Sequence, residues 1–162
     1  MHDDLRPLLL ALDGVRQNPH HHPERDALFH SLQTFHVALR DTRDPILLAA
    51  ALFHDVGKAL AGPDHAIDGA DLLDGLVSHR VVWLVRHHLD LLRAPQRTRR
   101  RLRNTPPLAD LERLRRYDLG GRNPEARVMH PDDAMNILMQ SSDILLPSDD
   151  ELACSDDEVF TG

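Results

Sequence analysis

The stretch Leu48–Lys58, LAAALFHDVGK, decides the fold of this chain. It continues an unbroken apolar run over residues 46–53, and a helix that is apolar on all sides is normally buried. Asp44 is a favoured N-cap residue and Pro45 suits the first helical position. The sequence therefore predicts a buried helix over residues 45–55.

His54 and Asp55 end this apolar helix, and Gly57 then allows the chain to turn. An imidazole and a carboxylate in such a place are costly, because an unpaired buried charge destabilises a fold by several kcal/mol. A bound metal ion would satisfy both side chains. The pattern therefore favours a metal site at the end of the helix.

The stretch resembles the signature of the HD-domain metal-dependent phosphohydrolases. That signature has a first His on an earlier helix, a His-Asp doublet after an apolar helix, often an x-Gly-Lys sequel, and a distant Asp. Here His30 lies 24 residues before the doublet His54–Asp55, and Gly57–Lys58 follows it. The resemblance covers about residues 20–145. It implies an all-α fold, a single HD-domain bundle of about six to seven helices.

A second resemblance lies in residues 22–32, HPERDALFHSL, which are similar to the lead-in of the HD domains of bacterial CCA-adding tRNA nucleotidyltransferases. It implies that His22, Glu24 and Asp26 border the active site rather than bind the metal. The sequence contains no nucleotidyltransferase domain. We therefore expect a stand-alone HD protein without a CCA-adding role.

The other periodic segments also have helical spacing, and none shows the alternation of a β-strand. The apolar stripe of the segment that contains His30 leaves this residue on the opposite face, which by itself favours a structural histidine. Further helices are predicted over residues 3–12, 25–40, from about 63, 79–93, 106–119 and 131–146.

Length and composition fit one domain, which we place at residues 1–146. Residues 147–162 are acidic with little to bury, so we expect them to be disordered. The single cysteine, Cys154, excludes an internal disulfide. No apolar run approaches 18 residues and the N-terminus lacks a signal-peptide pattern, so we expect a cytoplasmic protein without membrane contact. The net charge of −7 argues weakly against a general nucleic-acid binder.

The family resemblance implies metal ligands on several helices. His30, His54 and Asp55 would hold a first divalent ion. His65, followed by Gly69–Ala70, resembles the His-x-x-x-Gly-Ala element whose His binds a second ion in members with two metals. The alternative for His65 is a surface histidine near a helix start.

Two ligand positions have rival candidates. His87 and His88 are adjacent on a predicted helix, where neighbouring side chains point about 100° apart. We expect at least one of them to line the site, with a slight preference for His87. The last ligand is either Asp118, which precedes a Gly-Arg pair as in the CCA-type HD domains, or Asp143 on the final helix. Asp118 is preferred.

Such ligands imply an open site for one or two divalent ions (Mn²⁺, Mg²⁺, Ni²⁺, Co²⁺ or Fe²⁺) that activate water and polarise a phosphoryl group. Asp55 would bridge two ions. Lys58, the single Lys among 19 basic residues, would neutralise charge on the phosphate. Asp55 and Lys58 are therefore candidate catalytic residues. The implied reaction is hydrolysis of a phosphomonoester or phosphodiester, in a nucleotide or small phosphorylated metabolite.

Two other functions stay open. A non-catalytic regulatory module would bind metal or nucleotide without turnover, and a di-iron HD-type oxygenase would use the same ligands for oxidation. Residues 93–103 hold six arginines, of which Arg97–Arg103 offer a contact for RNA. Because no aromatic residues are interleaved for base stacking, a solvated loop and helix face is the favoured interpretation. The oligomeric state is not predicted.

Overall fold

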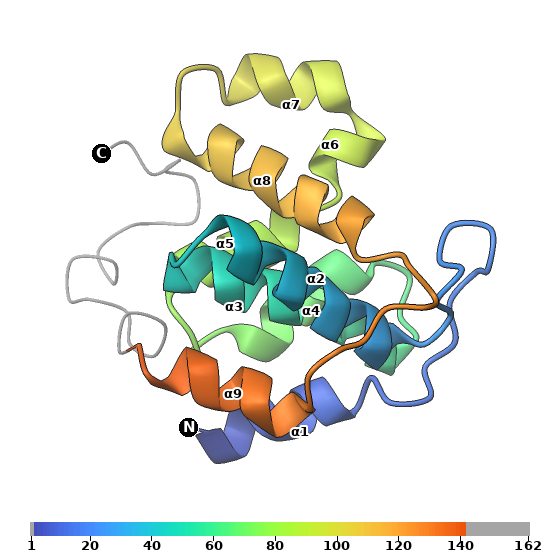
Figure 1. Ribbon diagram of the computed structural model, residues 1–162. Helices are drawn as coiled ribbons and strands as arrows, with labels where there is room; N and C mark the ends of the chain where they lie inside the picture. The colour runs from blue at the N-terminus through green and yellow to red at the C-terminus, as the bar shows by residue number, and fades with distance from the viewer. Residues whose placement is uncertain (1, 142–162) are drawn as a thin grey trace.

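The computed structural model describes residues 2–141 (Figure 1). These residues form α-helices and one short 3₁₀ helix, and their only β-pairing is an isolated bridge between Arg16 and Asp26. The predicted all-α fold class is thus confirmed. In chain order the elements are α1 (His2–Leu10), α2 (Ala27–Asp41), α3 (Pro45–Phe53), η1 (Val56–Leu60), α4 (His65–Leu73), α5 (His79–His87), α6 (Asp90–Arg93), α7 (Pro95–Arg101), α8 (Pro106–Gly120) and α9 (Pro131–Met139).

Helix α3 is the centre of the bundle. The Asp44 side chain caps it by accepting a hydrogen bond from the Ile46 N–H at 2.9 Å, and Pro45 is its first residue. Every residue from 46 to 53 is buried. Because α2, α5, α8 and α9 all pack against α3, each of its sides requires apolar side chains.

The chain leaves α3 through the His-Asp doublet. The helix ends at Phe53, two residues earlier than predicted, and His54 keeps helical dihedral angles. Asp55 has φ −103° and ψ 6°, after which η1 begins. This tight turn returns Lys58 to the doublet, and its Nζ lies 2.6 Å from Asp55 Oδ2.

Gly57 is required by close packing rather than by the turn alone, which corrects the prediction made for it. Its φ is not in the left-handed region. A Cβ added to Gly57 would lie 2.0 Å from the carbonyl oxygen of His65 and 2.5 Å from the backbone nitrogen of Gly69. Helix α4 therefore lies directly on the backbone of η1, which fixes the position of His65.

Helices α2 and α8 pack against each other in antiparallel directions (Figure 1). Asp26 caps the start of α2 by accepting from the Phe29 N–H at 2.9 Å, and it also accepts from the Gly14 N–H at 2.8 Å. Asp26 thus both caps α2 and holds the loop that contains Gly14. It does not line the pocket described below, unlike the expectation that it borders the site.

The described residues contain more helices than the six to seven predicted, for two reasons. The predicted helix over residues 79–93 breaks after His87, which divides it into α5 and α6. The arginine-rich stretch, expected to be a solvated loop and helix face, forms helix α7. Two of its arginines are paired, Arg99 with Glu112 and Arg101 with Asp90, both at 3.1 Å.

Helices α1 and α9 lie side by side along one edge of the bundle, where Arg6 Nε is 2.6 Å from Asp132 Oδ1 (Figure 1). The predicted final helix begins at Pro131 as expected and is described as far as Met139. The expected disordered tail, residues 147–162, lies outside the described residues.

Within residues 2–141, no single helix is both long and apolar enough to cross a membrane. A pair bent by 111°, residues 45–60 with α4, meets the length and composition criteria only when taken together.

Candidate metal centre

The carboxylate of Asp55 is the centre of a buried polar cluster, with imidazole nitrogens around both oxygens. On one side, Oδ2 lies 3.3 Å from His54 Nε2 and 3.7 Å from His30 Nε2. On the other side, Oδ1 lies 3.2 Å from His65 Nε2 and 3.7 Å from His88 Nε2. The sequence thus brings histidines from four separate segments to one carboxylate.

His54 and His88 are oriented in the same way, each at the C-terminal end of a helix. His54 Nδ1 donates to the carbonyl of Ala51 at 3.0 Å, and His88 Nδ1 donates to that of Val85 at 2.6 Å. Both acceptors are final-turn carbonyls, which have no partner within an ordinary helix. With the proton held on Nδ1, each Nε2 presents its lone pair to Asp55.

His30 reaches the cluster from the first turn of α2 and is fully buried. Its Nδ1 lies 2.8 Å from both the carbonyl oxygen of Gly121 and Oε1 of Glu24. The buried Glu24 in turn contacts His22 Nδ1 at 2.9 Å. A carboxylate behind the distal nitrogen is a usual support for a metal-binding histidine.

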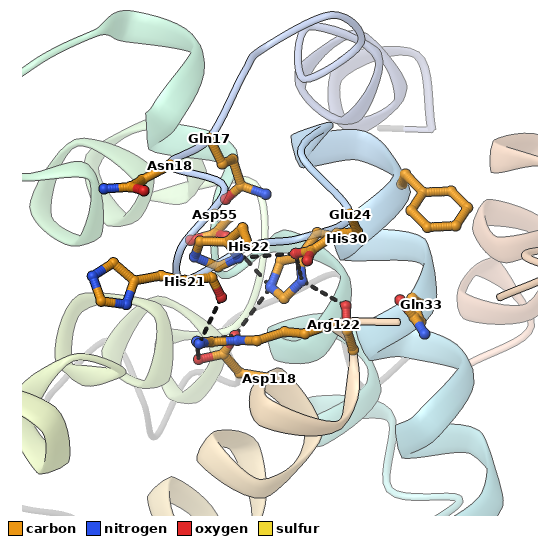
Figure 2. Close-up of polar contacts among 12 residues, drawn as sticks. Gln17, Asn18, His21, His22, Glu24, His30, Gln33, Asp55, Asp118 and Arg122 are labelled. Atoms are coloured by element: carbon orange, nitrogen blue, oxygen red, sulfur yellow. Dashed lines mark hydrogen bonds and ion pairs between the residues drawn. The ribbon is translucent and has the colours of Figure 1, made fainter. Parts of the chain in front are cut away.

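Asp118 joins the cluster from the last turn of α8. Its Oδ1 lies 3.0 Å from His30 Nε2 and 3.9 Å from His54 Nε2. Arg122 holds this carboxylate from the other side, at 3.4 Å from both oxygens, and also donates to the carbonyl of His21 at 3.0 Å (Figure 2). Arg122 therefore ties the loop before α2 to Asp118.

The electrostatics of the cluster favour charged carboxylates. Burial raises the pKa of Asp55, but the charges of His54 and Lys58 outweigh it and hold that pKa well below its usual range. Burial likewise raises the pKa of Asp118, but contact with His30 and the charge of His54 together outweigh burial and lower that pKa. Burial lowers the pKa of His30, yet its contacts with Asp118 and Glu24 raise it to about 9.

The residues present fit a metal centre. The Nε2 atoms of His54 and His88 are buried, and neither has a hydrogen-bond partner among the described residues, while that of His30 faces the carboxylate of Asp118. Buried polar atoms are rarely left unpaired, because each costs about 1–3 kcal/mol. Among the described residues, three groups of possible ligand atoms lie within 4.8 Å of one another. Two of them share Asp55, which lies with His30 and His54 in one and with His65 and His88 in the other. The third consists of His22, Glu24 and His30.

Lys58 lies at the edge of this centre. Its ammonium donates to Asp55 Oδ2 at 2.6 Å and to Oε1 of Gln17. An ammonium has three donors, so one stays available to an incoming ligand. Lys58 is partly exposed and lines the pocket described next.

A cavity of about 710 Å³ opens above the cluster. Asp55 and Asp118 of the cluster line it, together with the apolar side chains of Leu89 and Leu92. Five cationic residues line it, which are Arg16, Lys58, Arg93, Arg115 and Arg122. A cavity of this size accommodates a ligand much larger than phosphate alone.

The structure separates the rival ligand candidates. His88 contacts Asp55, whereas His87 Nδ1 lies 2.9 Å from Asp90 and its ring lies 4.5 Å from that of Trp83. The slight preference for His87 thus falls on a residue outside the cluster. Asp118 lies in it, and Asp143 lies outside the described residues.

Sequence reasoning missed Gln17, Arg122 and Arg115 as residues of the pocket. Gln17 sits in a loop without periodicity, and nothing in the sequence marks it. Arg122 had a signal, because it is the Arg of the Gly-Arg pair after Asp118. Arg115 could have been placed on the face of Asp118, since residues three apart on a helix are neighbours.

Comparison with known proteins identifies the family. The sequence profile described as "HD domain" matches residues 28–130, which is more than half of the chain. This chain belongs to the HD domain family. The HD domain places it in the superfamily of metal-dependent phosphohydrolases, whose members bind divalent metals. Among residues 2–141, the two groups that share Asp55 and the adjoining group His22, Glu24 and His30 could hold such ions.

Curated relatives include proteins named "Multifunctional CCA protein". That of Methylococcus capsulatus is 48% identical over 60 residues, which cover 37% of this chain and 14% of the relative. That of Hahella chejuensis is 36% identical over 80 residues, covering 45% of this chain and 19% of the relative. The matches thus span less than a fifth of these relatives.

Proposed function

We propose that this protein hydrolyses phosphate esters of a nucleotide or small phosphorylated metabolite, using water activated by one or two divalent ions. The observation that carries the proposal is the position of Asp55. Each of its oxygens faces a different pair of histidines, within a centre that opens into a cavity. Such a carboxylate can hold two ions close together, an arrangement found in two-metal phosphatases and nucleases.

His30, His54, Asp55 and Asp118 would hold the first ion, and His65 and His88 with Asp55 the second. Divalent ions in such a centre lower the pKa of water and offset the negative charge of a phosphoryl group. The chain itself supplies orientation. The carbonyls behind His54 and His88 fix their tautomers, and Glu24 holds His30.

Lys58 would bind the substrate phosphate. Asp55 and Gln17 hold its ammonium on two sides, so the remaining N–H can donate to a phosphoryl oxygen. Because charge on the phosphoryl oxygens must be stabilised in the transition state, a fixed cation at this position accelerates the reaction without rearrangement.

The test is hydrolysis of a generic phosphomonoester and a generic phosphodiester by metal-stripped protein. Mn²⁺, Mg²⁺, Ni²⁺, Co²⁺ or Fe²⁺ is added back singly, and Asp55→Ala is assayed in parallel. Turnover that requires an ion and disappears in Asp55→Ala supports the proposal and ranks monoester against diester.

Absence of turnover with every ion, despite stoichiometric metal binding, contradicts the proposal. Oxygen consumption by the iron-loaded protein would then indicate an oxygenase. Metal binding with neither reaction would indicate a regulatory module.

A further inference from the structure

The cavity above the metal centre is strongly cationic, although the chain as a whole carries a net charge of −7. Its lining contains five Arg or Lys residues and two carboxylates, Asp55 and Asp118. Both carboxylates lie in the metal cluster, where bound divalent ions would neutralise them. Metal-loaded protein would therefore present a pocket with a large positive potential, which attracts anions beyond a single phosphate.

Most of these cations already have a partner. Arg93 pairs with Asp64 at 2.7 Å, and Arg122 is held by Asp118 and the carbonyl of His21. Lys58 is bound to Asp55 and has one donor left for the scissile phosphate. These contacts leave Arg115 and Arg16 for any further anion.

Arg115 is the better placed of the two. Arg16 is exposed at the mouth of the cavity, whereas Arg115 is half-buried. It lies one helical turn before Asp118 on α8, about 4.5 Å along the axis, and so on the same face. Among residues 2–141, no hydrogen bond or ion pair engages its side chain. Its neighbours Arg113 and Arg116, in contrast, both bind Asp41.

An arginine stays charged in proteins and its guanidinium has five N–H donors, so a half-buried arginine without a partner favours a ligand with paired oxygens. The lining also contains Leu89 and Leu92, which offer an apolar surface beside the cationic residues. The lining thus suits an organic group that carries anions at two separate places.

We propose that the substrate carries a second anionic group, remote from the scissile phosphate, and that Arg115 binds it. The substrate class is then a bisphosphorylated organic molecule such as a nucleoside bisphosphate. This inference rests on the proposed function for the position of the first phosphate. It goes further by assigning a specificity-determining residue outside the metal centre.

The experiment compares adenosine 5′-monophosphate with adenosine 3′,5′-bisphosphate on metal-loaded protein. Isothermal titration calorimetry gives the affinity for each ligand, and phosphate release gives kcat/KM. Both are measured for wild type, for Arg115→Gln, and for Arg103→Gln. Arg103 is an exposed arginine that does not line the cavity, so its substitution gives the same charge change elsewhere.

The expected result is that wild type binds the bisphosphate roughly tenfold to a hundredfold more tightly than the monophosphate. Arg115→Gln should lose this preference while its affinity for the monophosphate changes by less than about threefold. Arg103→Gln should keep the preference. In Arg115→Gln the affinities for the two ligands should also depend on salt concentration to a similar degree, because the extra charge interaction with the bisphosphate is lost.

Equal affinity of wild type for the two ligands overturns the inference, and so does an equal loss in Arg115→Gln and Arg103→Gln. In either case the proposed hydrolysis stands if the monophosphate is turned over. Conversely, an Arg115-dependent preference in calorimetry without any phosphate release supports the second anion site and contradicts the hydrolase. The two failures are thus distinguishable.

Discussion

Two polar clusters join the antiparallel helices α2 and α8, one at each end of α2, and they differ in how completely their atoms are paired. At one end, His30 and Asp118 belong to the metal centre, in which buried imidazole nitrogens lack hydrogen-bond partners. At the other end, Asp41 accepts hydrogen bonds from Tyr117, Arg113 and Arg116, the two arginines at 3.1 and 3.2 Å.

The difference shows how to separate a stabilising cluster from a binding site. Around Asp41, Tyr117, Arg113 and Arg116 all donate to the carboxylate, and none of these residues has a buried side-chain N or O atom without a hydrogen-bond partner. The cluster therefore fastens the end of α2 to α8. Around Asp55 the residues stay incompletely paired even though they are buried more deeply. Natural folds retain buried polar atoms without partners mainly where a bound ligand offsets their unfavourable free energy.

The largest expected effect comes from Asp55→Asn. The change keeps the size of the side chain but removes the charge that both groups of histidines share. Bound metal, counted by elemental analysis, should fall from one or two ions to well below one, and any hydrolysis should fall by roughly a thousandfold or more. Asp41→Asn is the matched control at the other end of α2. Equal metal content in wild type and Asp55→Asn would contradict the assignment of the centre.

His87 and His88, at the C-terminal end of α5, provide the next comparison. His88→Gln should lose an ion and lower phosphate release on the order of a hundredfold, because His88 faces Asp55. His87→Gln, which removes a ring packed on Trp83, should retain the metal content and activity of wild type. A larger loss in His87→Gln than in His88→Gln would show that the helix end is arranged differently in solution.

Glu24→Gln tests the support of the first ion with a smaller expected effect. The amide can still accept from the rings of His30 and His22, but without the negative charge it makes His30 a weaker ligand. Metal affinity measured by competition with a chelator should decrease about tenfold. Glu125→Gln, at an exposed carboxylate, is the control. No change in Glu24→Gln would assign Glu24 to packing alone.

The smallest effect on the metal centre is expected from Asp41→Asn, which should instead change stability with pH. The hydrogen bond from Tyr117 and the bonds from Arg113 lower the pKa of Asp41. A lowered native pKa means that the carboxylate stabilises the fold above the unfolded pKa of about 4, and that this contribution is lost as the pH falls further.

Thermal unfolding of metal-free protein should therefore show a lower Tm for Asp41→Asn than for wild type at pH 7. The two values should converge as the solution approaches pH 3. A Tm difference that is the same at both pH values would indicate lost packing instead of lost charge.

Several residues of the metal centre were predictable because local sequence patterns mark their positions. The apolar run before His54 forces a buried helix end, and Asp44 with Pro45 marks where that helix begins. His30 could be named only through the family resemblance, since its place opposite the apolar stripe favoured a structural role. In the structure α3 and α8 both pack against α2, so residues outside the apolar stripe of α2 can also be buried.

Other features of the metal centre depend on a helix break and on loop conformations that hydrophobic periodicity does not predict. The choice between His87 and His88 follows from the break between α5 and α6, and neither Gly nor Pro marks that break. Glu24 and Gln17 reach the centre from an irregular loop, so periodicity says nothing of their direction. The cavity itself arises from α6, α8 and this loop together, and no single segment predicts it.

Because Gly57 has no side chain, the distance between η1 and α4 is set by direct backbone contact. His65 belongs to α4, and at Gly57 the backbone of η1 lies directly against the backbone of α4. Any side chain at residue 57 would act as a wedge that lifts His65 away from Asp55 and leaves His30 and His54 where they are. The number of ions that the protein holds would thus be set by a residue that binds none of them.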